Sequence, residues 1–144
     1  MSSIRSEEGF RAPVAGTGVP PRDVAMVFCG GVLGALARAG LVEAWPPRAG
    51  HWPWVTFAVN IAGAALIGWL AGHYRGQMRG PGYRFWGSGL CGALTTFSTM
   101  QLELFDMLDE HRIGLALAYA AASIAAGLAA VAVVSALRRR WAPA

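Results

Sequence analysis

Apolar residues fall into four long segments along this chain, and short polar connectors separate them. The segments cover residues 23–44, 53–74, 85–108 and 113–137. A helix of about 20 apolar residues is long enough to cross the ~30 Å hydrocarbon layer of a bilayer, and each segment reaches that length. The pattern therefore predicts an all-α integral membrane protein with four transmembrane helices in each subunit.

The chain outside this four-helix domain, residues 23–137, is polar and forms two tails. Residues 1–22 are rich in Gly and Pro and contain no apolar stretch before a cleavage site. We therefore expect a flexible N-terminal tail there and no secretory signal. Residues 138–144 begin with three arginines, which predicts a short basic C-terminal tail.

Composition favours a membrane protein over other classes. Of the 144 residues, 55% are hydrophobic and 14% are charged, whereas soluble domains carry about 25% charged residues. The arginines lie at segment ends and not on one amphipathic face, so the net charge of +4 does not indicate a nucleic-acid partner. The sequence contains no nucleotide-binding loop, carboxylate dyad or nucleophile–base pair. We therefore expect a lipid environment, no nucleotide partner and no enzymatic activity.

The third apolar segment contains a run that is poorly suited to a continuous helix. Residues 87–103 read G-S-G-L-C-G-A-L-T-T-F-S-T-M-Q-L-E. Gly costs a helix interior roughly 1 kcal/mol relative to Ala, and Thr and Ser are also weak helix formers. Irregular backbone at membrane depth is tolerated only where it is packed in protein or lines a cavity. The run predicts a third helix that is broken mid-span, which is typical of an ion or substrate path.

Small and polar residues recur at four-residue spacing in the other segments. Gly30, Gly34 and Arg38 form one such stripe, in which the glycines allow close packing of helices. Arg38 either reaches the membrane interface or binds a partner inside the bundle. Asn60 also has two interpretations, because an unpaired amide in lipid is costly. It either forms a hydrogen bond between helices or lines a pore as a donor.

Uncharged polar groups therefore collect at membrane depth. Tyr119 and Ser123 supply hydroxyls in the fourth segment, and Phe97 lies among the hydroxyls of the third. Hydroxyl and amide protons can replace water around an anion, the positive edge of a phenyl ring can face one, and carbonyls released at a helix break can hold a cation. Glu103 is either a solvated acid at a helix end or a group at a pore vestibule. The lack of a mid-span carboxylate disfavours a proton-coupled pump.

The segments contain motifs that match a known family. The chain resembles the Fluc (CrcB) fluoride channels over roughly residues 23–137, through the successive pieces G-G-V-L-G-A-L-A-R, T-F-A-V-N-I-A-G, G-L-C-G-A-L-T-T-F-S-T and Y-A-A-A-S. The third piece is highly specific in a membrane context. The resemblance implies a passive fluoride-selective channel in the inner membrane that exports cytoplasmic fluoride and so protects the cell. It also implies an antiparallel, dual-topology homodimer, and a homodimer suits a subunit whose four helices hardly enclose a pore.

The resemblance also implies roles for single residues. A central sodium ion would be held at the third-helix break by the backbone carbonyls of Gly92 and Thr95 from each subunit. Phe97 would contact fluoride with its ring edge, whereas Met100 replaces the family's second phenylalanine and offers no such edge. Glu103 falls where the family has an acidic residue near a pore end. The residues expected along the fluoride pathway are Asn60, Phe97, Ser98, Thr99, Met100, Tyr119 and Ser123.

The arginine distribution departs from what dual insertion requires. Four spans place both termini on one side of the membrane, and that side holds nine arginines against two on the other, with Arg38 counted as intramembrane. The positive-inside rule then places the termini in the cytoplasm. Either the arginines of the long tail count little, or this chain pairs with an oppositely oriented relative.

Two other functions are compatible with parts of the sequence. A small multidrug or cation transporter is also four-helical, but it normally uses a membrane-embedded Glu, and Glu43 lies close to the end of the first segment. A structural membrane protein without transport would account for the glycine stripes. It would leave the hydroxyl cluster of the third segment unexplained, so the fluoride channel is the leading hypothesis.

Overall fold

The computed structural model describes most of the chain, and every regular element in the described part is helical. Residues 1–18 and 142–144, which belong to the two predicted tails, lie outside it. The side chain of Trp141 is also excluded. The described residues are 19–48, 50–75, 77–78 and 80–141.

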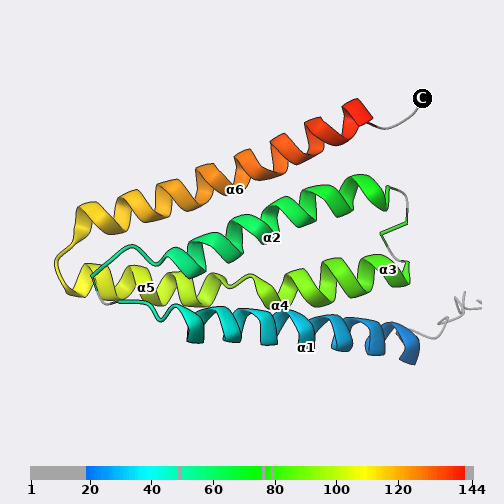
Figure 1. Ribbon diagram of the computed structural model, residues 1–144, viewed down its shortest axis with the longest axis horizontal. Helices are drawn as coiled ribbons and strands as arrows, with labels where there is room; N and C mark the ends of the chain where they lie inside the picture. The colour runs from blue at the N-terminus through cyan, green and yellow to red at the C-terminus, as the bar shows by residue number, and fades with distance from the viewer. Residues whose placement is uncertain (1–18, 49, 76, 79, 142–144) are drawn as a thin grey trace, which may run out of the picture.

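Within the described residues, three helices are long and apolar enough to cross a membrane. They are α1 (Pro21–Ala44), α2 (Trp54–His73) and α6 (Ile113–Trp141). They lie side by side with a fourth, composite element, and consecutive elements point in opposite directions (Figure 1). α1 begins and α6 ends at the same end of this bundle, which we call the terminal end. The opposite end, which carries the α1–α2 loop and the α5–α6 turn, is the loop end.

The composite element, third along the chain, is interrupted near its middle. At the interruption Thr95 has φ −74° and ψ 152°, and Thr96 has φ −146° and ψ 112°, so both are extended. The break that the sequence predicts is therefore present, and it is visible between α4 and α5 (Figure 1). The π-helical stretch η1 just before it is a rare conformation that occurs frequently at functional sites. The parts of the element are α3 (Pro81–Tyr83), η1 (Arg84–Cys91), α4 (Gly92–Leu94) and α5 (Phe97–Asp109).

Glycines bring α1 and η1 together backbone to backbone. Gly30 and Gly34 are the buried residues of α1. A methyl group added to either would overlap a carbonyl oxygen of η1, that of Phe85 or that of Leu90. Gly89 makes the same close approach from the η1 side. Because no side chain separates the two backbones, the broken element is held tightly against an unbroken helix.

A cluster of buried hydrophobic residues lies at the loop end. Met107, Ala116 and Tyr119 are buried against one another. The Trp52 ring meets Tyr119 edge to face, with ring centroids 5.4 Å apart. These contacts join α5, α6 and the residues just before α2, and they fix the end of the bundle at which the polar side chains described below converge.

The outer surface of the long helices is apolar. Phe28 and Leu36 on α1 and Ile124 and Leu128 on α6 are between 63% and 69% exposed. Contiguous apolar surface of this kind is unusual for a soluble monomer and marks a membrane or protein contact. The long helices therefore present apolar side chains outward.

α6 continues past residue 137, where the basic tail was expected to begin. The helix includes Arg138, Arg139 and Arg140 and ends at Trp141. Arg138 Nη1 donates to the Trp69 carbonyl at 3.0 Å, and its guanidinium lies 5.3 Å from the centroid of the Trp69 ring. Arg138 is therefore part of the packed bundle, because a carbonyl and an aromatic face of α2 bind it.

We expect Gly34→Ala to lower the apparent melting temperature of the protein in detergent, measured by circular dichroism. The new methyl group would meet the backbone of Leu90, which cannot move aside as a side chain would. Gly40→Ala is the matched control, because Gly40 lies in the same helix with no atom within 4 Å of the added carbon. It should be neutral or stabilising, since Ala is favoured over Gly by roughly 1 kcal/mol in helices. Equal melting temperatures for the two variants would contradict the backbone contact.

Candidate ion pathway at the helix break

The break diverts backbone donors that a continuous helix would use internally. The Thr96 N–H donates to Asn60 Oδ1 at 2.9 Å, so it does not bind the carbonyl of Gly92 four residues earlier. The Thr99 N–H likewise donates to Thr96 Oγ1 at 3.1 Å, so it does not bind the carbonyl of Thr95. The carbonyls of Gly92 and Thr95 therefore lose their usual helical donors, as the last carbonyls of any helix do.

Asn60 holds the break in place from α2. Its Nδ2 donates to the Thr96 carbonyl at 3.1 Å, while its Oδ1 accepts from the Thr96 N–H. One side-chain amide thus satisfies both backbone groups of a residue that has left the helix. Of the two interpretations of Asn60, the structure shows the hydrogen bond between helices. Its place along a fluoride pathway stays a prediction.

Two further side chains bind carbonyls just before the break. Arg38 Nε donates to the Ala93 carbonyl at 3.2 Å, so Arg38 binds a partner inside the bundle. Thr95 Oγ1 donates to the Cys91 carbonyl at 2.8 Å, and its methyl group packs against Gly63 of α2. A positive charge is favourable beside carbonyls at the C-terminal end of a helix. The carbonyls just before the break are therefore capped by Arg38 of α1 and by Thr95 at the break itself.

A second group of polar side chains surrounds Glu103 on α5. Thr56 Oγ1 donates to Glu103 Oε1 at 2.5 Å, and Tyr119 OH donates to Glu103 Oε2 at 2.8 Å. Thr56 and Tyr119 are buried, while Glu103 is half-buried. The three side chains come from α2, α6 and α5, so this carboxylate joins three elements and is not a freely solvated acid.

Two cavities lie beside Glu103 at the loop end. Their volumes are about 600 Å³ and about 310 Å³. Glu103, Thr99 and Arg48 line both of them, together with other residues of the loop before α2. Glu103 therefore lies beside a hollow, and its place at a pore vestibule stays a prediction.

Four predicted pathway residues point into the subunit. Thr99 accepts at 2.8 Å a hydrogen bond from the Thr96 hydroxyl, next to the break. Tyr119 is fully buried, and Ser123 Oγ is buried without a well-formed hydrogen bond to any described residue. Met100 is half-buried and packs against the core at the loop end. These groups follow α5 and α6 on the side that faces the other helices.

Two other predicted pathway residues point away from the subunit. Phe97 is 70% exposed, and Ser98 beside it is also exposed. Both lie in the first turn of α5, directly after the break. The single chain therefore does not bring Phe97 together with Tyr119 and Ser123. A pathway that includes them all needs a wall that this chain alone does not supply.

Comparison with known proteins identifies the family. Residues 25–135 match the family described as "CrcB-like protein, Camphor Resistance (CrcB)", and this range contains the break and every predicted pathway residue. The chain belongs to the CrcB family. The resemblance drawn from the four motifs is thereby confirmed. Three apolar helices of membrane length in a CrcB chain also make it a multi-pass membrane protein.

Several CrcB relatives are similar over nearly their whole length. The chain is 48% identical over 121 residues to a fluoride-specific ion channel, FluC 1, of Mycolicibacterium paratuberculosis, covering 83% of this chain and 92% of the relative. A protein of the same name from Mycobacterium tuberculosis is 47% identical over the same shares. FluC 2 of Nocardia farcinica, also named a fluoride-specific ion channel, is 39% identical over 132 residues, covering 86% of this chain and 91% of the relative.

Two residues of the polar network in this CrcB chain were not among the pathway residues expected from the sequence. Thr96 uses its backbone and its hydroxyl to organise the break, and Thr56 binds Glu103. Thr56 lies four residues before Asn60, so the spacing that marked the other stripes also marks it. The sequence does not distinguish Thr96 from its neighbour Thr95, because only the structure shows which of the two threonines forms hydrogen bonds with the Asn60 side chain.

Proposed function

We propose that this chain is the subunit of a fluoride-selective channel in the inner membrane, through which fluoride passively leaves the cytoplasm. The observation that carries the proposal is the identity of 47–48% to relatives named as fluoride-specific ion channels, over 92% of their length. The electrochemical gradient would drive the flux without nucleotide or catalysed chemistry. Removal of fluoride from the cytoplasm would protect the cell from its toxicity.

The polar groups of the subunit suit a small, strongly hydrated anion. Ion pathways work when protein groups replace the water around the ion. The Ser123 hydroxyl is a buried donor without a well-formed partner, and the Ser98 hydroxyl is exposed beside the break. Thr99 lines the cavities at the loop end. These hydroxyls offer protons to an anion without binding it as tightly as a full positive charge would.

An antiparallel homodimer with four crossings per subunit is the assembly that we propose. The broken third element lies along the other three over their length, which supports a fourth crossing (Figure 1). Phe97 and Ser98 are exposed directly after the break. A hydroxyl facing lipid is unfavourable, so a second copy would cover this surface and complete the pathway. Met100 is half-buried in its own subunit, which leaves Phe97 as the aromatic contact for fluoride from each chain.

The arginine bias bears on how the two copies are oriented. By sequence, nine arginines belong to the side of the four spans that carries the termini, and Arg48 and Arg112 belong to the other side. In the described part, Arg84 forms an ion pair with Asp23 at 3.2 Å, and Arg138 is bound to Trp69. Arginines whose charge is bound within the bundle contribute less to the difference in positive charge between the two sides than the count of nine to two indicates. We therefore keep the homodimer with both orientations, and an oppositely oriented relative as partner is the other outcome of the test.

The carbonyls of Gly92 and Thr95 fit a sodium ion at the break. Both have lost their helical donors, because the Thr96 and Thr99 amides bind elsewhere. Oxygen atoms of free carbonyls are ligands that hard cations accept. We propose that two such pairs, one from each subunit, hold the ion. It would neutralise the partial negative charge of the carbonyls and join the two breaks.

The competing transporter hypothesis needs a carboxylate buried within the membrane, and Glu43 does not meet that need. Glu43 is exposed and is the penultimate residue of α1. At that position it lies at the membrane boundary, where a proton-coupled carboxylate would have no buried substrate to exchange with.

We expect purified protein in liposomes to release fluoride much faster than empty liposomes, and chloride no faster than them. A fluoride electrode and a chloride electrode measure the two fluxes after a potassium ionophore balances the charge. Chloride release at the rate of fluoride, or no fluoride release at all, would overturn the proposed function.

Two variants examine the pathway in the same liposome experiment. Phe97→Ile removes the ring edge and should lower fluoride release at least tenfold, an effect of about 1.4 kcal/mol. Phe105→Ile is its matched control, because Phe105 is similarly exposed on the same helix at 64%. Asn60→Asp loses the donor to the Thr96 carbonyl and should lower release as strongly. Unchanged release in both Phe97→Ile and Asn60→Asp would remove those residues from the pathway.

We expect replacement of sodium by N-methylglucamine to weaken the dimer. The four free carbonyls of Gly92 and Thr95 would then face one another without a cation between them. Size-exclusion chromatography in detergent, with and without sodium, measures the dimer fraction. A dimer fraction that does not respond to sodium would contradict a structural ion at the break.

We expect a cysteine placed at Ala144 to react from both sides of the inner membrane. Native Cys29 and Cys91 are changed to Ser so that only the new thiol is labelled. An impermeant maleimide applied to intact spheroplasts should label about half of the chains, because dual topology divides them equally. Labelling of none or of all would show a single orientation and would favour an oppositely oriented relative as the partner.

A further inference from the structure

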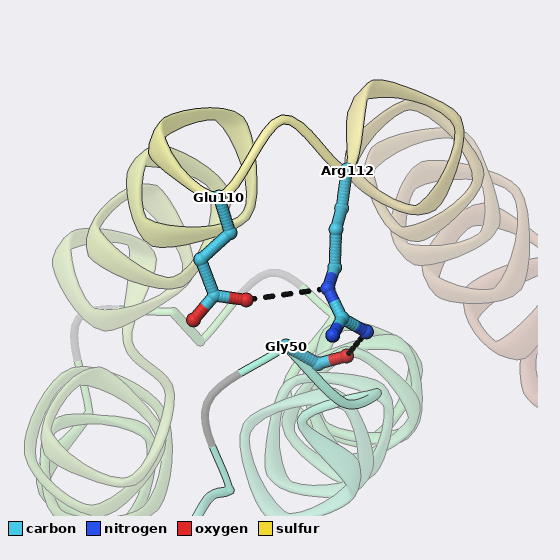
Figure 2. Close-up of polar contacts among 3 residues, drawn as sticks. All are labelled: Gly50, Glu110 and Arg112. Carbon is cyan, nitrogen blue, oxygen red and sulfur yellow. Dashed lines mark hydrogen bonds and ion pairs between the residues drawn. The ribbon is translucent and has the colours of Figure 1, made fainter.

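The loop between α1 and α2 is held against the α5–α6 turn by a set of contacts that we call the clasp. Arg112 Nη1 donates to the Gly50 carbonyl at 2.5 Å, and Arg112 Nε lies 3.3 Å from Glu110 Oε2 (Figure 2). Gly50 is buried with φ +66°, a conformation that favours glycine. A side chain there would overlap both Glu110 and Arg112. The clasp therefore fixes where the loop lies over the loop-end cavities.

Arg48 is the positive charge that this loop presents to the cavities. It lines both of them and is exposed. Its guanidinium forms no hydrogen bond or ion pair with the described residues. The other arginine at this end, Arg112, is bound in the clasp. The carboxylates that line the cavities are Glu103 in both and Asp106 in the smaller one.

We propose that Arg48 collects fluoride at the mouth of the loop-end cavities, an inference that rests on the proposed channel function. A cation at the mouth of a hollow raises the local concentration of anions and so raises their rate of entry. Arginine side chains serve this purpose in anion pores. Without Arg48 the negative potential of Glu103 and Asp106 would dominate the mouth and repel fluoride. Gly50, Glu110 and Arg112 are positioning residues, because they hold the loop that carries Arg48.

The test compares fluoride release from liposomes at low and high ionic strength, set with potassium isethionate at subsaturating fluoride. The Debye length is about 30 Å at 0.01 M and about 3 Å at 1 M. Arg48→Gln should release fluoride about threefold more slowly than the unaltered protein at 0.01 M and at nearly the same rate at 1 M, because salt screens the lost charge. Arg48→Lys keeps the charge and should match the unaltered protein at both.

Two further variants separate the charge of Arg48 from other causes. Arg139→Gln removes one exposed arginine from the terminal end and should leave release unchanged at both ionic strengths. Gly50→Ala keeps Arg48 but disturbs the clasp, and it should reproduce part of the loss at low salt.

The outcomes distinguish this proposal from the function on which it rests. Equal release by Arg48→Gln and the unaltered protein at 0.01 M would overturn the role of Arg48 and leave the channel function intact. A deficit in Arg48→Gln that persists at 1 M would also overturn it, because a structural fault does not respond to screening. Absence of fluoride release from the unaltered protein would overturn the channel function itself.

Discussion

The side-chain amide of Asn60 keeps the third element open at Thr96, and the other polar contacts near the break depend on this. Two hydrogen bonds, of 2.9 Å and 3.1 Å, satisfy both backbone groups of Thr96 where water is scarce. Thr96 then acts as the N-cap of α5, since its hydroxyl accepts from the Thr99 N–H. Because the N–H groups of Thr96 and Thr99 already form hydrogen bonds, a continuous helix through the break would add no hydrogen bond for them.

Close packing of glycines gives the break its second support. Gly30 and Gly34 bring α1 directly onto the backbone of η1, and this proximity lets Arg38 reach the Ala93 carbonyl. On the opposite side, Gly63 leaves room for the methyl group of Thr95. Helix packing and hydrogen bonding at the break therefore depend on each other. A larger residue in place of one of these glycines would separate the helices and leave carbonyls without donors in an apolar medium.

The two ends of the bundle carry different electrostatics. At the loop end, Glu103 is bound by Thr56 and Tyr119 and lies beside cavities that Arg48 also lines. In the proposed channel, an anion would move from this charged mouth toward the neutral hydroxyls near the break. Binding that is favourable at entry and weak along the path is what conduction requires. Phe97 is exposed directly after the break, where the proposed second subunit would complete the wall.

The sequence by itself determined the four apolar segments, the position of the break and the family. The segments and the break follow from local composition and spacing, because glycines and threonines weaken a helix and small residues four apart share a face. The family followed from the resemblance of four motifs. Only the tertiary structure decided which groups bind one another. Asn60 and Thr96 are 36 residues apart, Thr56 and Glu103 are 47 apart, and Arg38 and Ala93 are 55 apart. Partners at such separations depend on which helix faces pack together, and periodicity within one segment carries no information about that.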